Sequence, residues 1–522
     1  MSSRSRHRAP ARILVGTFLF GTFLVGACTA PSNPGQGTGT STGERTAPGD
    51  PVSGTSGGTA FGDGVPPAST GQTLPFRPTP VPPAPPLVPS GATACPAGAT
   101  PPVRPVSARG QSAEPPPDAA PVPPGDPGDP GGTTTTTAVT PASALAHLRG
   151  DARVKDDQVS VSVWIDGIGE AITHDPDLPL KPASNQKLLT AMGVLAHLDP
   201  NERLRTRVLA TGPSTTDGVV LGDLIIVGGG DPSLEPTGPH SIDALAVAVT
   251  AAGVRRVTGR VLVDETRFDQ VRTATGWPPK WWEDVGSLSA LAVDRNWYRL
   301  DDAFRNDPNQ FNAQLFSFAL KAHGVEVDGG AGVGITPVEG GVEVAATESA
   351  PINEMVNLML LRSDNFYAEI FLKELAHRDT GRPGTTAGGI AVIHRLFAGA
   401  CAPITGNVAD GSGLSYDNAH SARELRTLVQ VSQRYPWGSL LVADLPLAGA
   451  SDGFGNRLKD PATSGRVRAK GGSLNVARSL TGFTATASGR GVVFSIIING
   501  PNVREAQGAI DDFVIAVASL RL

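Results

Sequence analysis

The chain has 522 residues, a formal net charge of −6 and an aromatic content of 5%. Because an acidic balance with few aromatic side chains provides neither a basic stripe nor a stacking surface, we expect no nucleic-acid partner. More than half of the 47 prolines lie before residue 138. This distribution divides the chain into a proline-rich N-terminal part and a remainder long enough for a large core.

The N-terminus predicts an export signal. Four arginines precede an apolar segment, residues 13–27, that is too short to span a bilayer. Residues 24–28 read LVGAC, which resembles a bacterial lipobox whose cysteine, Cys28, becomes the lipid-modified first residue. We expect residues 1–28 to be a lipoprotein-type signal peptide and the mature protein to be lipid-anchored at the outer face of the cytoplasmic membrane, within the cell wall. The alternative is an ordinary signal peptide with a coincidental cysteine.

Residues 29–137 predict a disordered stalk rich in Pro, Gly and Thr. The segment lacks the apolar periodicity that would offset the cost of ordering its backbone. Cys95 lies in this stalk and Cys401 in the globular part, and in an oxidising compartment the two could form a disulfide. Two unpaired thiols are the alternative, and the sequence leaves this question open.

The globular part begins and ends with sheet-forming segments. Residues 159–165 alternate like a strand, and residues 492–498 form a β-branched run that ends at Asn-Gly. Asn502 and Glu505 follow as a helix cap and its partner, and apolar residues then recur at helical spacing from 506 to 517. We therefore expect one sheet with covering helices, closed by the two ends of the chain.

Residues 206–345 predict an inserted lobe. Short apolar runs at 224–227, 260–263 and 341–344 are broken by glycine and aspartate, and one helical stretch covers 242–252. We expect this lobe to be mostly β with at least one helix. Residues 138–205 and 346–522 would then make up the main domain, an α/β (α+β) unit.

Three short motifs suggest the chemistry. They are Ser184-x-x-Lys187, Ser363-x-Asn365 and Lys470-Gly471-Gly472. Each is weak alone, but in this order they follow the S-x-x-K, S-x-N and K-[TS]-G layout of serine enzymes that are acylated by penicillin. A serine hydroxyl needs a nearby base, and positions i and i+3 of a helix share a face. Lys187 can be that base if burial or a second cation, such as Lys470, destabilises its ammonium form.

Further landmarks make the resemblance specific. Beyond the three motifs, the matching segments along residues 140–520 are PASNQKLLT (182–190), LGDL (221–224), GGGDP (228–232), DGSGLS (410–415) and GRVRAK (465–470). The chain resembles the class C low-molecular-mass penicillin-binding proteins, the D-alanyl-D-alanine carboxypeptidase/endopeptidase family. The resemblance implies a transpeptidase-like antiparallel sheet packed by helices, with an insertion after the S-x-x-K helix. It also implies peptidoglycan stem peptides as substrates and β-lactam antibiotics as mimics.

The resemblance also implies the roles of individual residues. Ser184 would be acylated and Lys187 would accept its proton, while Ser363 would relay a proton to the leaving D-alanine. Asn365 would bind the substrate amide, and Lys470 would bind the terminal carboxylate. The segment Gly471-Gly472-Ser473 would contact the substrate, with the backbone N–H groups of Ser184 and Ser473 stabilising the oxyanion.

One residue departs from the family pattern. Gly471 stands where the family has Thr or Ser, whose hydroxyl hydrogen-bonds the substrate carboxylate. Losing that bond removes about 0.5–1.5 kcal/mol, or up to about 3 kcal/mol with a charged partner. Because Lys470 and the backbone of the following residues remain, we expect recognition of the substrate carboxylate to be weakened or altered. Ser473 could compensate for the missing hydroxyl.

Other functions fit the sequence less well. The glycine-rich segment 228–232 lacks the Lys-Ser/Thr of a P-loop, and the nine histidines show no metallopeptidase spacing, so we expect no metal or cofactor. The segment 410–413 reads better as a turn near the site than as a nucleophile loop. A β-lactamase would need a carboxylate that positions water, and no residue can be assigned to that task. A wall-binding lipoprotein with weakened catalysis is the alternative that Gly471 supports.

Overall fold

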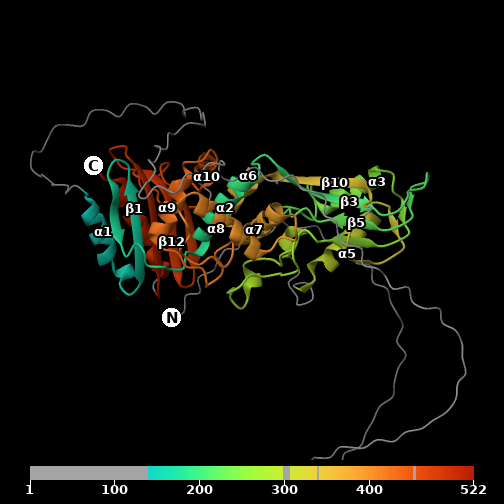
Figure 1. The fold of residues 1–522 in the computed structure, drawn as a ribbon, viewed down its shortest axis with the longest axis horizontal. Coiled ribbons are helices and arrows are strands. Elements are labelled where there is room, and N and C mark those ends of the chain that lie inside the picture. The colour runs from blue at the N-terminus through green and yellow to red at the C-terminus, as the bar shows by residue number, and fades with distance from the viewer. Residues whose placement is uncertain (1–138, 298–305, 338–339, 451–453, 456, 502) are drawn as a thin grey trace, which may run out of the picture. The chain divides into compact units, whose positions relative to one another are not determined.

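The computed structural model describes residues 139–297, 306–337, 340–450, 454–455, 457–501 and 503–522 (Figure 1). The expected signal peptide (1–28), stalk (29–137) and cap residue Asn502 lie outside the described residues. Cys401 is disulfide-bonded, and the other two cysteines, Cys28 and Cys95, lie outside the described residues. No helix in the part of the chain that the structure describes is long and apolar enough to cross a membrane.

The two ends of the globular part meet in one antiparallel sheet with the strand order β11-β12-β13-β1-β2. Strands β1 and β13 pair from Gln158 opposite Asn499 to Ile165 opposite Val492. The predicted closure of one sheet by both ends is therefore confirmed. The strands are β1 (Gln158–Ile165), β2 (Gly169–His174), β11 (Arg468–Leu474), β12 (Ala477–Ala485) and β13 (Gly491–Asn499).

Helices cover both faces of this sheet. Alternate residues of β13 pack on opposite faces of the sheet. Phe494 belongs to a hydrophobic cluster with residues of α1 and α11, whereas Val493 belongs to a cluster with residues of α2 and α6 to α10. Figure 1 shows α1 and α9 on opposite sides of β1. The helices are α1 (Pro141–Gly150), α2 (Gln186–His197), α6 (Ile352–Arg362), α7 (Asn365–Thr380), α8 (Thr386–Gly399), α9 (Ala422–Ser432), α10 (Gly438–Asp444) and α11 (Val503–Ala518).

The insertion contains a second sheet, ordered β10-β3-β5-β7-β9, and a small parallel sheet, β4-β6-β8. The pairs β10–β3 and β3–β5 are antiparallel, whereas β5, β7 and β9 are parallel. Parallel neighbours need crossover connections, and α3 and α5 lie in these connections. The elements are β3 (Arg203–Ala210), β4 (Val219–Val220), β5 (Leu224–Val227), α3 (Ile242–Ala251), β6 (Arg256–Val257), β7 (Val261–Asp264), α5 (Pro308–Ala322), β8 (Glu326–Val327), β9 (Ala331–Val333) and β10 (Val342–Pro351).

The expected strands and helix α3 of the insertion are present, and α5 is a second helix that the sequence did not predict. Two buried asparagines occupy the inward face of α5, where periodicity arguments look for apolar residues. Asn309 donates to Glu265 Oε2 at 2.7 Å and to Ser289 Oγ at 2.6 Å, and Asn312 donates to the carbonyl of Leu291 at 3.2 Å. These bonds satisfy the donor groups of both amides, although Asn312 Oδ1 is buried without a hydrogen-bond partner among the described residues. The helix thus packs with a partly polar inward face.

Charged groups join the insertion to α7, which is buried along most of its length. Arg267 follows β7 and donates to Glu374 Oε2 at 2.7 Å, and Arg378 donates to Glu374 Oε1 at 2.7 Å. Burial would raise the pKa of Glu374, but the two guanidinium groups outweigh it and hold the pKa at about 2. Lys373 of α7 also pairs with Asp269 of the insertion. The insertion is thus fixed to the helix that begins at Asn365.

Candidate active site

Ser184 and Lys187 lie together where a 3-10 turn, η2 (Ala183–Asn185), leads into α2. Lys187 Nζ lies 3.2 Å from Ser184 Oγ, 2.6 Å from Asn365 Oδ1 and 2.6 Å from the carbonyl oxygen of Ser412. A neutral amine has two N–H donors and one lone pair, and the two carbonyl-type oxygens can accept both donors. The lone pair would then face the Ser184 hydroxyl, which is the geometry of a general base.

The environment of Lys187 favours the neutral amine. Burial lowers the pKa of Lys187 to about 8, against the opposing charges of Asp410, Glu369 and Asp364. Burial and the charge of Asp410 raise the pKa of Glu369 to about 8, so this neighbour opposes deprotonation less than an ordinary carboxylate would. The expected second cation, Lys470, does not cause this shift: burial lowers the pKa of Lys187, and burial followed by repulsion from Lys187 lowers the pKa of Lys470.

The Ser363-Asp364-Asn365 motif forms the junction between α6 and α7. Ser363 ends α6 in the left-handed region at φ +56°. Asp364 caps α7 by accepting the backbone N–H of Tyr367 at 3.0 Å, and it also accepts Arg295 Nε at 2.9 Å. Asn365 begins α7 and donates to the backbone carbonyl of Asp284 at 3.1 Å. The insertion, through Asp284 and Arg295, therefore orients the amide that contacts Lys187.

A second lysine–serine pair lies beside the first. Lys470 on β11 is buried, and its Nζ donates to Ser363 Oγ at 2.9 Å and to the carbonyl of Gly471 at 2.9 Å. Burial, Lys187 and Arg457 lower the pKa of Lys470 well below its ordinary range. The contact connects Ser363 to a group that can give or take a proton, as a relay to a leaving amine requires.

The strand segment after Lys470 is shaped by close approach. A side chain at Gly472 would place Cβ 2.2 Å from Ser479 Oγ and 2.6 Å from the carbonyl oxygen of Pro182, so only glycine fits there. Ser473 is exposed, and together with Ser184 it lines two cavities of about 290 and 520 Å³. Ser184 thus borders two spaces, an arrangement that would suit cleavage of a bond between two substrate portions.

Comparison with known proteins agrees with this geometry. Residues 142–301 and 302–519 match the model of the D-Ala-D-Ala carboxypeptidase 3 (S13) family. The chain belongs to this family. The predicted resemblance to class C low-molecular-mass penicillin-binding proteins is therefore confirmed.

Individual relatives agree with the family match. A carboxypeptidase of Mycobacterium tuberculosis is 32% identical over 354 residues, covering 64% of this chain and 75% of that protein. A D-alanyl-D-alanine carboxypeptidase of an Actinomadura species is 28% identical over 414 residues, covering 63% and 75%. The crystal structure of penicillin binding protein 4 from Haemophilus influenzae has a TM-score of 0.62 at 20% identity, covering 68% of this chain and 93% of that one. The last likeness confirms the expected fold class.

The sequence predicted only a turn near the site at residues 410–413. In this S13 chain the loop 410–415 also contacts the site residues directly. The carbonyl of Ser412 accepts Lys187 Nζ, and Glu369 Oε1 accepts the Ser412 N–H at 2.8 Å. Asp410 accepts the N–H groups of Gly413 at 2.8 Å and Ser415 at 2.7 Å, and Trp277 Nε1 of the insertion donates to it at 3.0 Å. The loop therefore positions the Ser412 carbonyl against Lys187 Nζ. A backbone carbonyl leaves no side-chain signature, so no motif could have revealed it.

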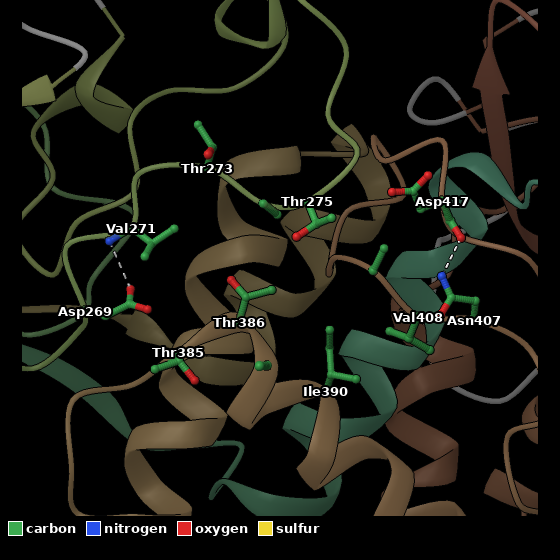
Figure 2. A pocket seen from close by; sticks show the side chains of 13 residues that line it. Asp269, Val271, Thr273, Thr275, Thr385, Thr386, Ile390, Asn407, Val408 and Asp417 are labelled. Carbon is green, nitrogen blue, oxygen red and sulfur yellow. Dashed lines mark hydrogen bonds between the residues drawn. The ribbon is translucent and has the colours of Figure 1, made fainter.

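Two other places fit catalysis less well. A cavity of about 580 Å³ lies between the loop 269–275, the start of α8 and residues 407–409 (Figure 2). It is lined mainly by threonines and small apolar side chains, and it contains none of the motif residues.

Among the described residues, His147, Asp151 and Asp512 could converge on a metal. However, Arg153 Nη2 already lies 2.5 Å from Asp151 and 2.6 Å from Asp512, so a guanidinium supplies the positive charge there.

Proposed function

We infer that the protein is a serine D-alanyl-D-alanine carboxypeptidase that removes the terminal D-alanine of peptidoglycan stem peptides through an acyl-enzyme on Ser184. The observation that carries this inference is the placement of Lys187 Nζ 3.2 Å from Ser184 Oγ, with two other oxygens at 2.6 Å available for its N–H groups. The family and its named carboxypeptidase relatives support the same reaction.

The reaction follows from the two lysine–serine pairs. Lys187 takes the proton of Ser184 as the hydroxyl attacks the carbonyl of the penultimate D-alanine. The oxyanion lies between the N–H groups of Ser184 and Ser473, where one such donor contributes about 3–4 kcal/mol to the lowering of the barrier. The C–N bond then breaks, and Ser363, in contact with Lys470, passes a proton to the leaving amine. The proton that Lys187 took up replaces the one that Ser363 gave away. Water then attacks the ester, and its proton passes through Lys187 to Ser184 Oγ as the ester C–O bond breaks.

The same site explains acylation by penicillins and cleavage of crosslinks. A β-lactam presents a strained amide and a carboxylate in the positions of the D-Ala-D-Ala tail, so Ser184 would open it. The Haemophilus influenzae protein has been crystallised with a β-lactam, at 20% identity to this chain. A crosslink is the same amide with a longer leaving group, and the two spaces beside Ser184 support endopeptidase activity as well.

We propose that the protein is exported and anchored by a lipid at Cys28. The basic and apolar N-terminal segments and the LVGAC string support this location. Metabolic labelling with a radioactive fatty acid should mark the wild-type protein and not a Cys28→Ala variant. Equal labelling of both would rule out this anchor.

Release of D-alanine from a synthetic stem pentapeptide tests the enzymatic function. The wild type should release it, and Ser184→Ala should lose about 10³-fold or more of the rate. Covalent labelling by a fluorescent penicillin should disappear in the same variant. A wild type that binds penicillin without releasing D-alanine would instead favour a wall-binding protein, and rapid hydrolysis of a chromogenic β-lactam would favour a β-lactamase.

A further inference from the structure

Gly471 leaves a space beside the catalytic lysines that a side chain could fill. A Cβ built on Gly471 would lie 3.3 Å from Arg457 Nη1, 3.9 Å from Leu480 Cδ1 and 4.0 Å from the carbonyl oxygen of Ser479. No backbone atom approaches as closely as at Gly472, so packing does not demand glycine at this position. The atom nearest to the missing Cβ is thus a guanidinium nitrogen.

Arg457 is held in this position from its far side. Asp511 of α11 accepts Arg457 Nε at 3.0 Å and Nη2 at 2.7 Å, and the guanidinium carbon lies 5.6 Å from the centre of the Phe454 ring. These contacts use the edge of the guanidinium away from Gly471, and Nη1 takes part in none of them. A guanidinium fixed by one carboxylate is prepared to bind another with little loss of side-chain freedom.

The cavity next to Arg457 is suited to an anion. This space of about 290 Å³ is lined by Ser184, Ser363 and Ser473. Because Ser363 is the proposed proton donor to the leaving amine, and because it does not line the larger cavity, we assign this space to the leaving D-alanine. The guanidinium groups of Arg362 and Arg457 line it together with the amine of Lys470, and none of its lining residues is acidic. A carboxylate is the anionic group that the substrate of the proposed function carries at this end.

We propose that Arg457 binds the terminal carboxylate of the substrate, and of penicillins, through Nη1, in place of the hydroxyl that position 471 lacks. This inference rests on the proposed function. A guanidinium donates a charge-assisted bond where the hydroxyl would donate a neutral one. Gly471 is then the residue that leaves room for the guanidinium–carboxylate contact. The site is altered in its recognition of the carboxylate, and it is not impaired.

The acylation rates of Ser184 by benzylpenicillin and by its methyl ester, followed by intact-protein mass spectrometry, test this proposal. The ester removes the carboxylate charge and keeps the reactive amide. Arg457→Gln should lower the rate with benzylpenicillin about 10- to 100-fold, the range expected for a lost bond to a charged group. The rate with the ester should stay within about twofold, because the ester makes no such bond. Gly471→Thr in the Arg457→Gln background should restore part of the selectivity.

Controls separate this contact from a general effect on folding or charge. Arg382→Gln changes an exposed arginine outside the cavity and should keep the wild-type ratio of the two rates. Arg457→Lys retains a positive charge without the fork, and its ratio should fall between those of the wild type and Arg457→Gln. If both variants at 457 keep the wild-type ratio, the proposal is wrong. A wild type that neither reagent acylates would refute the proposed function itself, and this inference with it.

Discussion

The acylation of Ser184 should follow the protonation state of Lys187. The pKa of Lys187 is about 8, compared with an ordinary value of 10.5. At pH 7 this difference raises the neutral fraction of the amine from about 0.03% to about 10%, a gain of roughly 300-fold that corresponds to about 3 kcal/mol. Because the buried position of Lys187 causes the shift, the gain is a property of the folded site.

The rate constant for acylation by benzylpenicillin should therefore rise about tenfold from pH 6 to pH 7 and reach half of its maximum near pH 8. Glu369→Gln should move the half-maximum to lower pH, because the charge of Glu369 opposes deprotonation of Lys187. The amide oxygen can still accept the Ser412 N–H. Glu348→Gln, an exposed change on β10, serves as the matched control. A flat profile between pH 6 and pH 9, or a half-maximum near 10.5, would refute the role of Lys187 as the base.

Three further results should follow from individual side chains. Gly471→Thr should slow acylation by benzylpenicillin about 2- to 10-fold, because its Cβ would lie 3.3 Å from Arg457 Nη1 and would crowd the guanidinium–carboxylate contact, and a faster variant would show that the missing hydroxyl matters more than the space. Burial raises the pKa of Asp444 from 3.8 to about 7, so the cost of this carboxyl to stability builds up as the pH rises between these two values and is complete above them. Asp444→Asn should therefore raise the free energy of unfolding by about 2 kcal/mol at pH 8 and much less at pH 4. Equal gains at both pH values in urea melts would contradict this cause. The pKa of Glu374 is depressed to about 2, so its contribution is present above pH 4.5 and is lost as pH falls toward 2. Glu374→Gln should lower the free energy of unfolding by about 3–5 kcal/mol at pH 7 and reduce the decrease in stability between pH 4.5 and pH 2. If the variant loses as much stability as the wild type over this pH range, another group causes the decrease.

The sequence predicted what side-chain identity and spacing encode. Ser184 and Lys187 were recognisable because one helical turn separates them, and the closing strands because β-branched runs mark them. Helix α7 was not predicted, because it is buried on nearly all sides and shows no amphipathic stripe. Likewise, the partners of Asn365 and Lys187 that come from Asp284 and Ser412 are backbone carbonyls. Such contacts depend on how distant segments pack, and a single sequence does not reveal them.

The pairing of β1 with β13 has a consequence for biogenesis. The strand that precedes the nucleophile helix gains its neighbour only when residues 491–499 become available, more than three hundred positions later. A chain that leaves the ribosome or a translocon N-terminus first must therefore keep β1 without this partner until nearly all of it has emerged. Chaperones would have to shield that edge, and a premature stop before β13 would leave Ser184 without the framework that supports it.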